Sequence, residues 1–458
     1  MLKKSIKIIA LSFMGIYTSG AQSAAFGIAE QSALGLGSAF SGGAAAAEDA
    51  STIWFNPAGM TRINGNQLVL GAHLIAPSFD FDDQGSTTGL GVPLTADSSN
   101  DGGRFAIVPN FYYVHSLDNG LKLGLGINSP LGMATKYNDD WMGKYQAIES
   151  EIVTVNINPS IAWKATNNLS LGFGISIQYI EATLTNKIDF TTICASLTGT
   201  TCSAIPGSST NDGFSKLEGD DISYGFNFGA LYQLSEKTRF GFSYRSEIKH
   251  DLEGKADFFV PTTVTSDTTA ITSPGPTLGF PVGPVLATAF ADSDISTQPD
   301  MPASASISLH HQWSSHVALT TDATWLGWSS VPNLTIMFDN AAKSDSIEEL
   351  RLKDNIRLSI GATYSTDGPW SFRTGFAYDE GAARNASSRT SRFPDNDRYW
   401  LTAGASYQLS EDITIDTAYA HIFVPDTKLD RIGSTDQHLL GKYESDADIL
   451  SAQIRWNL

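Results

Sequence analysis

The chain contains few charged residues, little cysteine and no long apolar run. None of its 458 residues lies in a run of the roughly 18 to 20 apolar residues that a transmembrane helix needs, which excludes a helical membrane protein. Basic side chains are scarce, 29 against 48 acidic ones, and the formal net charge of −19 argues against nucleic-acid binding. Only 17% of the residues are charged while 41% are hydrophobic, which excludes a disordered chain. The length allows three ordinary soluble domains or one very large sheet.

Residues 1–23 have the three parts of a secretory signal peptide. Lys3, Lys4 and Lys7 form the charged region, residues 8–17 form a short apolar run, and Ala21-Gln22-Ser23 provides small residues for cleavage. The alternative is a short buried helix. Removal of this segment would leave an exported chain with a net charge of −22, because three lysines are lost from −19.

The two cysteines, Cys194 and Cys202, lie in a stretch rich in Thr, Ser and Gly. In an exported protein they can form a disulfide that closes a loop. A two-cysteine metal site is the weaker interpretation, since no histidine lies close by in the sequence. We therefore expect no metal and no cofactor.

Beyond residue 66 the dominant pattern is the alternation of apolar with small or polar residues. A pleated strand sends successive side chains to opposite faces, so each such segment has one apolar and one polar face. The clearest examples are residues 121–127, 169–179, 224–228, 401–409 and 450–458.

The connections between these segments alternate in length. Short turns are indicated at 117–120, 165–168, 234–237, 313–316, 365–368 and 409–412. Long polar connections lie near 80–103, 129–149, 186–218, 251–300, 327–352, 380–397 and 424–446. Six short turns and seven long loops require fourteen strands, and long loops on one side are typical of an outer-membrane barrel. The sequence thus predicts an all-β fold, a transmembrane antiparallel β-barrel of 14 strands. Soluble β-sandwiches or an eight-stranded ligand barrel would not explain the one-sided loops.

Residues 24–66 lack this alternation and consist largely of small residues. A barrel of fourteen strands has a lumen too wide for its own side chains to fill. We therefore expect this segment to plug the lumen, with the barrel formed by 67–458; the alternative is a disordered periplasmic tail.

Several motifs identify a family resemblance. They are Ser32-Ala-Leu-Gly-Leu-Gly-Ser-Ala-Phe-Ser-Gly-Gly43, Glu48-Asp-Ala50, the triplet Asn56-Pro57-Ala58, and the segments 129–140, 244–247, 370–379 and 395–400. In this order they resemble the outer-membrane long-chain fatty-acid transporter (FadL) family. The resemblance implies 14 strands plugged by an N-terminal hatch, a location in the Gram-negative outer membrane, and a monomer inserted by the barrel-assembly machinery. It also implies contact with outer-membrane lipid and lipopolysaccharide, and a hydrophobic small molecule as substrate.

The family also implies where a substrate would bind. A capture groove would lie between loops 186–218 and 251–300, where Phe258, Phe259, Leu278 and Phe280 give an unusual apolar content. The alternative is that these residues pack within the loop.

A second implied element is a kinked third strand that opens sideways into the bilayer. Its kink would lie at Pro130-Leu131-Gly132, because proline removes a ladder donor and glycine adds freedom. Phe26, at the start of the hatch, would anchor against it. The alternative is an ordinary strand end at a loop.

The polar residues leave the substrate open. The resemblance directs Asn56 and Asp379 toward the hatch contact, although either could make a structural hydrogen bond. Lys353 and Arg357 are candidates for binding a carboxylate, or else belong to a solvated wall. Glu181 and Glu348 occupy positions where family members that bind fatty acids have basic residues.

Passive uptake of long-chain fatty acids is therefore the first hypothesis. Uptake of monoaromatic or alkane hydrocarbons is the alternative. An adhesin barrel or an outer-membrane enzyme is more remote, and we expect no enzyme, because neither a Gly-x-Ser-x-Gly nor a His-Glu-x-x-His motif occurs.

Overall fold

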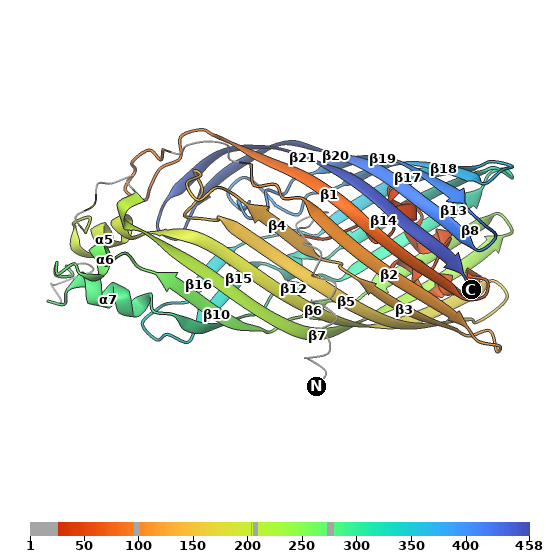
Figure 1. The fold of residues 1–458 in the computed structure, drawn as a ribbon, viewed down its shortest axis with the longest axis horizontal. Coiled ribbons are helices and arrows are strands. Elements are labelled where there is room, and N and C mark those ends of the chain that lie inside the picture. The colour runs from red at the N-terminus through yellow and green to blue at the C-terminus, as the bar shows by residue number, and fades with distance from the viewer. Residues whose placement is uncertain (1–25, 96–100, 203, 205–208, 273–278) are drawn as a thin grey trace.

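A computed structural model describes residues 26–95, 101–202, 204, 209–272 and 279–458. The predicted signal peptide and Leu278 lie outside the described residues. The chain forms a closed antiparallel barrel of 14 strands, which confirms the predicted fold class (Figure 1). The first and last strands close it, with pairing from Gln67↔Asn457 to Asp83↔Gly441.

Most barrel strands are continuous, whereas the third is interrupted and consists of β3 and β4. In order, the segments are β1 (Gln67–Asp83), β2 (Ala106–Ser116), β3 (Lys122–Asn128), β4 (Gly132–Lys136), β5 (Glu149–Lys164), β6 (Leu169–Asp189), β7 (Asp212–Ser235), β8 (Thr238–Arg245), β13 (Ser304–Gln312), β14 (Val317–Leu326), β17 (Asn355–Ser365), β18 (Trp370–Asp379), β19 (Arg398–Gln408), β20 (Ile413–Ile432) and β21 (His438–Asn457).

One end of the barrel carries additional short elements. They are β9 (Ile248–Lys249), β10 (Leu252–Phe259), β11 (Ser293–Thr297), β12 (Asp300–Met301), β15 (Asn333–Phe338), β16 (Ser346–Glu349), η2 (Ser209–Asn211), η3 (Trp328–Ser330) and the helices α5 (Phe190–Thr198), α6 (Thr262–Thr265) and α7 (Val282–Ala289). We call this the loop end and the opposite end, which holds the C-terminus, the turn end (Figure 1). In outer-membrane barrels the long loops are extracellular. Among the described residues, no helix is long and apolar enough to span a membrane.

Several predicted loops are shorter than expected. β20 and β21 remain paired up to Ile432↔His438, so the expected loop 424–446 is reduced to the turn 433–437. Likewise β6 and β7 pair up to Asp189↔Asp212, within the expected loop 186–218. These strand extensions are polar on their outer face, and their backbone hydrogen bonds extend the hairpins although the membrane-type alternation has ended.

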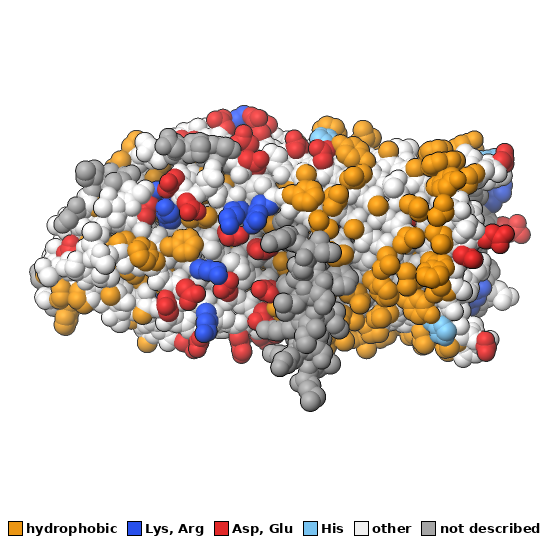
Figure 2. Space-filling model, viewed as in Figure 1, with side chains coloured by type: hydrophobic (Ala, Val, Ile, Leu, Met, Phe, Trp, Pro, Cys, Tyr) orange, Lys and Arg blue, Asp and Glu red, His pale blue; other side chains and the backbone are white. Residues whose placement is uncertain are grey.

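The faces of the long strands exchange polarity along the barrel. In β21 the outward side chains are Leu450, Ala452, Ile454 and Trp456 near the turn end, but Lys442, Glu444, Asp446 and Asp448 near the loop end. The inward ones are Ser451, Gln453 and Arg455 near the turn end, but Tyr443, Ala447 and Ile449 above them. Figure 2 shows the result as an apolar band over the half that ends at the turns, with charged residues over the other half. The barrel thus faces lipid at the turn end and encloses an apolar interior at the loop end.

The N-terminal segment, residues 26–66, lies inside the turn-end half (Figure 1). It forms α2 (Ala33–Leu36), α3 (Gly43–Ala46), α4 (Thr52–Phe55) and the 3₁₀ helix η1 (Pro57–Arg62). Leu36, Ile53 and Met60 are fully buried, which small side chains on the facing strands make possible.

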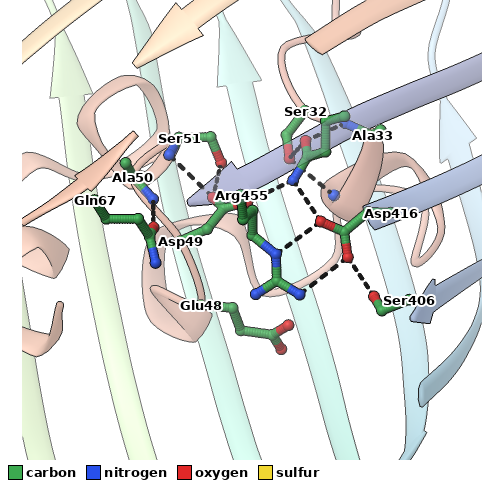
Figure 3. A network of polar contacts seen from close by, with 12 residues as sticks. Ser32, Ala33, Glu48, Asp49, Ala50, Ser51, Gln67, Ser406, Asp416 and Arg455 are labelled. Atoms are coloured by element: carbon green, nitrogen blue, oxygen red, sulfur yellow. Dashed lines mark hydrogen bonds and ion pairs between the residues drawn. The ribbon is translucent and has the colours of Figure 1, made fainter. Parts of the chain in front are cut away.

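A polar network joins this segment to the last two strands (Figure 3). The Gln453 Oε1 atom accepts hydrogen bonds from the Ala33 backbone N–H at 2.9 Å and the Ser32 hydroxyl at 3.2 Å. Its Nε2 donates to Asp49 at 2.7 Å and to Asp416 at 2.9 Å, and Asp416 pairs with Arg455 at 2.7 Å. Each buried polar group in this network therefore has a partner, as burial requires.

Asn56 joins the segment to the opposite wall. Its Nδ2 donates to the carbonyl groups of Ala44 at 2.6 Å and Ala230 at 3.0 Å, and its Oδ1 accepts from the Ala58 N–H at 3.0 Å. The close approach depends on glycine in the wall, since a Cβ at Gly172 would lie 2.3 Å from the Ala58 nitrogen.

We predict that Gly172→Val displaces the N-terminal segment while the barrel still assembles. The two methyl groups would overlap the backbone of η1, and overpacking of this kind costs about 1–3 kcal/mol. Channel conductance in planar bilayers should rise and the segment should become accessible to protease. The control is Gly368→Val in an exposed turn, where an added Cβ meets only the Thr366 side chain at 3.7 Å. Equal conductance in both variants would contradict the prediction.

Candidate functional site

The barrel wall is interrupted at its third strand. β2 pairs with β3 from Ser116↔Lys122 to Phe111↔Ile127. Beyond that point, Ala106–Asn110 of β2 has no ladder partner on this side among the described residues, and the next bridge is Gly103↔Thr135. Pro130 has no N–H to donate, so a regular ladder cannot continue through it.

The first residues of the N-terminal segment pair with the third strand at the break. The Ile28 N–H donates to the Pro130 carbonyl at 2.9 Å, and the Gly132 N–H donates to the Phe26 carbonyl at 3.0 Å. The Leu131 N–H donates to the Thr154 hydroxyl at 3.1 Å. Residues 26–28 therefore act as a very short substitute strand at the break.

Gln31 completes the polar contacts at the break. Its Nε2 donates to the carbonyl groups of Ser129 at 2.8 Å and Ile28 at 3.0 Å, and its Oε1 accepts from Asn128 at 2.7 Å. The side chain is fully buried, so these partners replace the water that the carbonyl groups would otherwise need.

Phe26 forms the floor of an apolar cavity, here called the inner cavity. Its ring packs edge-on against Trp328, with the ring centroids 4.6 Å apart, and against Phe393 at 5.8 Å. The other lining residues are mostly aliphatic and include Met133, Ile180, Ala182, Leu252, Ile295 and Leu350.

A second cavity, the lower cavity, borders the N-terminal segment and the break. Its wall includes Ile28, Pro130 and Leu131 but also polar groups such as Gln178 and Arg245. Met301 lines both this cavity and the inner one, and Phe26 of the inner cavity packs against Trp328, which lines the lower cavity.

The outer cavity lies among the loops and shares Leu217, Glu348 and Arg392 with the inner cavity. Here Phe258, Phe290 and Phe338 surround the Lys343 ammonium, which lies 4.9, 4.0 and 4.9 Å from their ring centroids. Burial lowers the pKa of Lys343 to about 8, so this side chain is mostly charged at neutral pH. The three cavities follow one another from the loop end to the break.

The predicted residues fall in different places. Phe26, Pro130 and Leu131 meet at the break, where a Cβ at Gly132 would lie 2.6 Å from the Ile28 side chain. Asn56 and its neighbours Pro57 and Ala58 lie instead at the wall near Gly172.

The two predicted cations differ in their surroundings. Lys353 pairs with Glu380 at 2.5 Å and lines none of the three cavities. Arg357 lines the lower cavity, donates to the Ala39 carbonyl at 2.9 Å and lies over the rings of Phe40 and Trp400. Asp379 is fully buried beside it and pairs with Arg398 at 3.5 Å.

The predicted capture residues also separate. Phe258 packs in the outer cavity, whereas Phe259 and Phe280 are about 60% and 62% exposed. Cys194 and Cys202 are disulfide-bonded and pack in the same loop cluster as Val264 and Val282.

The two glutamates have opposite orientations. Glu181 is exposed, accepts a hydrogen bond from Tyr179 at 2.9 Å and lies between the inward-facing Ile180 and Ala182, so its carboxylate does not face the lumen. Glu348 does line the inner cavity, but Arg392 neutralises it at 3.2 Å.

Arg392, Trp328, Gln31 and Lys343 were not anticipated from the sequence. No local sequence pattern identifies these four residues as part of the site. The alternation of β6, in contrast, could have placed Glu181 on the outer face.

The comparisons agree with this geometry. The family described as "Outer membrane protein transport protein (OMPP1/FadL/TodX)" matches residues 14–458. The chain is 30% identical to a long-chain fatty acid transport protein of Escherichia coli O6:H1 over 89% of each chain. It is 27% identical to outer membrane protein P1 of Haemophilus influenzae, covering 92% of this chain and 90% of that protein.

Solved structures show the same fold. A Pseudomonas aeruginosa FadL homologue superposes with a TM-score of 0.82 at 24% identity, covering 94% of this chain and 99% of that one. The P. putida toluene transporter TodX superposes with a TM-score of 0.63 at 18% identity, covering 89% and 94%.

We predict that Gln31→Leu loosens the break. The substitution keeps the volume but leaves the Ser129 carbonyl and the Asn128 amide without their partner, at about 1–3 kcal/mol for each buried group. Hydrogen–deuterium exchange of residues 126–133 should become faster. Gln408→Leu, at an exposed position of β19, is the control. Unchanged exchange at the break in the Gln31 variant would show that the side chain does not hold it.

Proposed function

The chain belongs to the OMPP1/FadL/TodX family of outer membrane transport proteins, and we propose that this member takes up long-chain fatty acids by passive diffusion. That it is an outer-membrane transporter of hydrophobic compounds follows from the family. The observation that supports the finer proposal is the series of three cavities, in which an apolar chamber is preceded by a mouth that carries cations. The curated relatives that match over most of their length are transport or outer membrane proteins, and we propose no catalytic activity.

Capture takes place in the outer cavity. Phe258, Phe290 and Phe338 offer apolar surface to an acyl chain, and the Lys343 ammonium lies among them. Arg384 and Arg431 also line this cavity, so its local charge favours an anionic head group although the whole chain is acidic.

The inner cavity then receives the acyl chain. Burial of apolar surface contributes about 25 cal/mol per Å², so a long chain gains affinity from the aliphatic lining. Phe26 closes the floor and must move with residues 26–28 for the ligand to pass toward the lower cavity. We propose that the N-terminal segment acts in this way as the hatch of the transporter.

Release occurs sideways through the break in the wall. Strand register supports this route. Residues 71–75 of β1 pair with Ala106–Asn110 of β2 on one side and with Ile449–Gln453 of β21 on the other. At this level the outward face of β21 changes from charged to apolar residues. The break therefore lies at the upper edge of the apolar band, where a fatty acid could enter the outer leaflet without crossing the polar lumen.

A second candidate substrate class is neutral aromatic hydrocarbon. The apolar lining of the inner cavity would accept it, and the fold is shared with a toluene transporter. The cations at the mouth favour the fatty acid, because a neutral ligand gains nothing from them. We further propose that the chain functions as a monomer and is inserted by the barrel-assembly machinery among outer-membrane lipid and lipopolysaccharide.

We predict that Ala182→Trp blocks the route. The indole would project into the inner cavity, and a steric cost of about 1.4 kcal/mol lowers occupancy about tenfold. The measurement is uptake of labelled oleate, and separately of toluene, by cells that lack their own transporter and express this chain.

The control is Thr183→Trp, which places the same indole on the outer face of the same strand. Oleate uptake that depends on the chain and is lost only in the Ala182 variant would support the proposal. Toluene uptake without oleate uptake would transfer the protein to the hydrocarbon class, and uptake of neither would refute the proposed function.

A further inference from the structure

Glu348 lies on the boundary between two cavities. It lines both the outer and the inner cavity, as do Arg392 and Leu217. A ligand that moves from the loop end into the apolar chamber therefore passes this carboxylate.

Its carboxylate is held by cations and a hydroxyl. Arg392 Nε lies 3.2 Å from Glu348 Oε2, Arg431 Nη2 lies 3.6 Å from Oε1, and the Thr390 hydroxyl donates to Oε1 at 2.8 Å. Burial raises the pKa of Glu348, but the charges of Arg392 and Arg431, together with the hydrogen bonds from Thr390 and Arg392, hold the pKa below its ordinary value. The residue is therefore ionised at neutral pH.

The two arginines are held in place by other contacts. Arg392 is 9% exposed at its side chain and donates from Nη1 to the Ser150 hydroxyl at 2.9 Å. Arg431 donates to the backbone carbonyl of Glu349 at 3.1 Å. With Glu348 the group carries one negative and two positive charges, so one positive charge remains in excess at the mouth of the inner cavity.

Two other acidic groups nearby have their own cations. Glu349 pairs with Arg351, and Glu218, which also lines the inner cavity, pairs with Lys216 at 2.7 Å. Two guanidinium groups around one carboxylate thus distinguish the Glu348 position from the rest of the lining.

We propose that Glu348 is an internal carboxylate that occupies the head-group site of this transporter and that the carboxylate of an incoming amphiphile displaces it from Arg392 and Arg431. Entry into the inner cavity is then an exchange of one carboxylate for another. This inference rests on the proposed function, and it names a carboxylate-bearing amphiphile as the ligand that this site selects.

The exchange has a physical advantage for a passive carrier. Two unoccupied guanidinium groups beside an apolar chamber would retain a fatty acid through charge-assisted hydrogen bonds, each stronger than a neutral one. Competition from Glu348 cancels most of that gain, so net affinity comes from burial of the tail and release remains possible. A neutral ligand with the same tail does not need to displace Glu348.

The test compares oleate with methyl oleate, which has the same tail and no charge, on the purified full chain in amphipol. Binding is read by tryptophan fluorescence. We expect E348Q to tighten oleate binding about tenfold, the scale of one charge-assisted hydrogen bond, and to leave methyl oleate unchanged. R392Q should weaken oleate relative to methyl oleate.

The matched control is E349Q, which neutralises the adjacent glutamate that lines only the outer cavity. Heat-modifiable mobility on gels reports whether each barrel is folded, and E348A serves as a second neutral variant if E348Q does not fold. Unchanged or weaker oleate binding by a folded Glu348 variant, or an equal change for methyl oleate, would overturn the proposal. If the unmodified chain binds neither ligand, the proposed function fails instead.

Discussion

The hydrogen bonds between residues 26–28 and the broken third strand are the contacts on which the rest of the structure depends. A bilayer offers no partner for backbone polar groups, so a spanning sheet must close on itself. Pro130 interrupts the ladder at one point, where the Ile28 N–H pairs with the Pro130 carbonyl and the Phe26 carbonyl pairs with the Gly132 N–H. On the other side of this break, Ala106–Asn110 has no ladder partner among the described residues. Because the same segment also places the Phe26 ring in the lining of the inner cavity, the bonds at the break and this ring form one unit.

The exchange of polarity along the strands explains where this unit lies. Below the exchange, apolar side chains face lipid and polar ones surround the N-terminal segment; above it, apolar side chains face inward. The inner cavity is therefore an apolar chamber held outside the bilayer by a barrel whose outer surface is polar. The break occurs where the half with apolar outward side chains meets the half with apolar inward side chains. At this level an apolar interior can adjoin the apolar core of the membrane.

Charge has a separate part in this arrangement. The chain is strongly acidic as a whole, yet cations gather at the outer cavity, where Lys343 lies among three aromatic rings and Arg392 and Arg431 hold Glu348. In the proposed function, the apolar lining supplies affinity for a tail of either class, and these cations distinguish ligands by their head group. Affinity and selectivity would then reside in neighbouring but different residues.

The sequence by itself determined the barrel. Strict alternation, six tight turns and the loops between them are local patterns with a period set by backbone geometry, and they yield the strand number and the lipid-facing residues. The ends of the strands could not be predicted as well, as the expected loop 424–446 shows. Outside the bilayer a hairpin continues without the apolar–polar alternation from which a strand is recognised. The cavities were decided only by the tertiary structure. Glu348 and Arg392 come from two different connections and Arg431 from the end of β20, and closure of the barrel, a long-range constraint, brings them together.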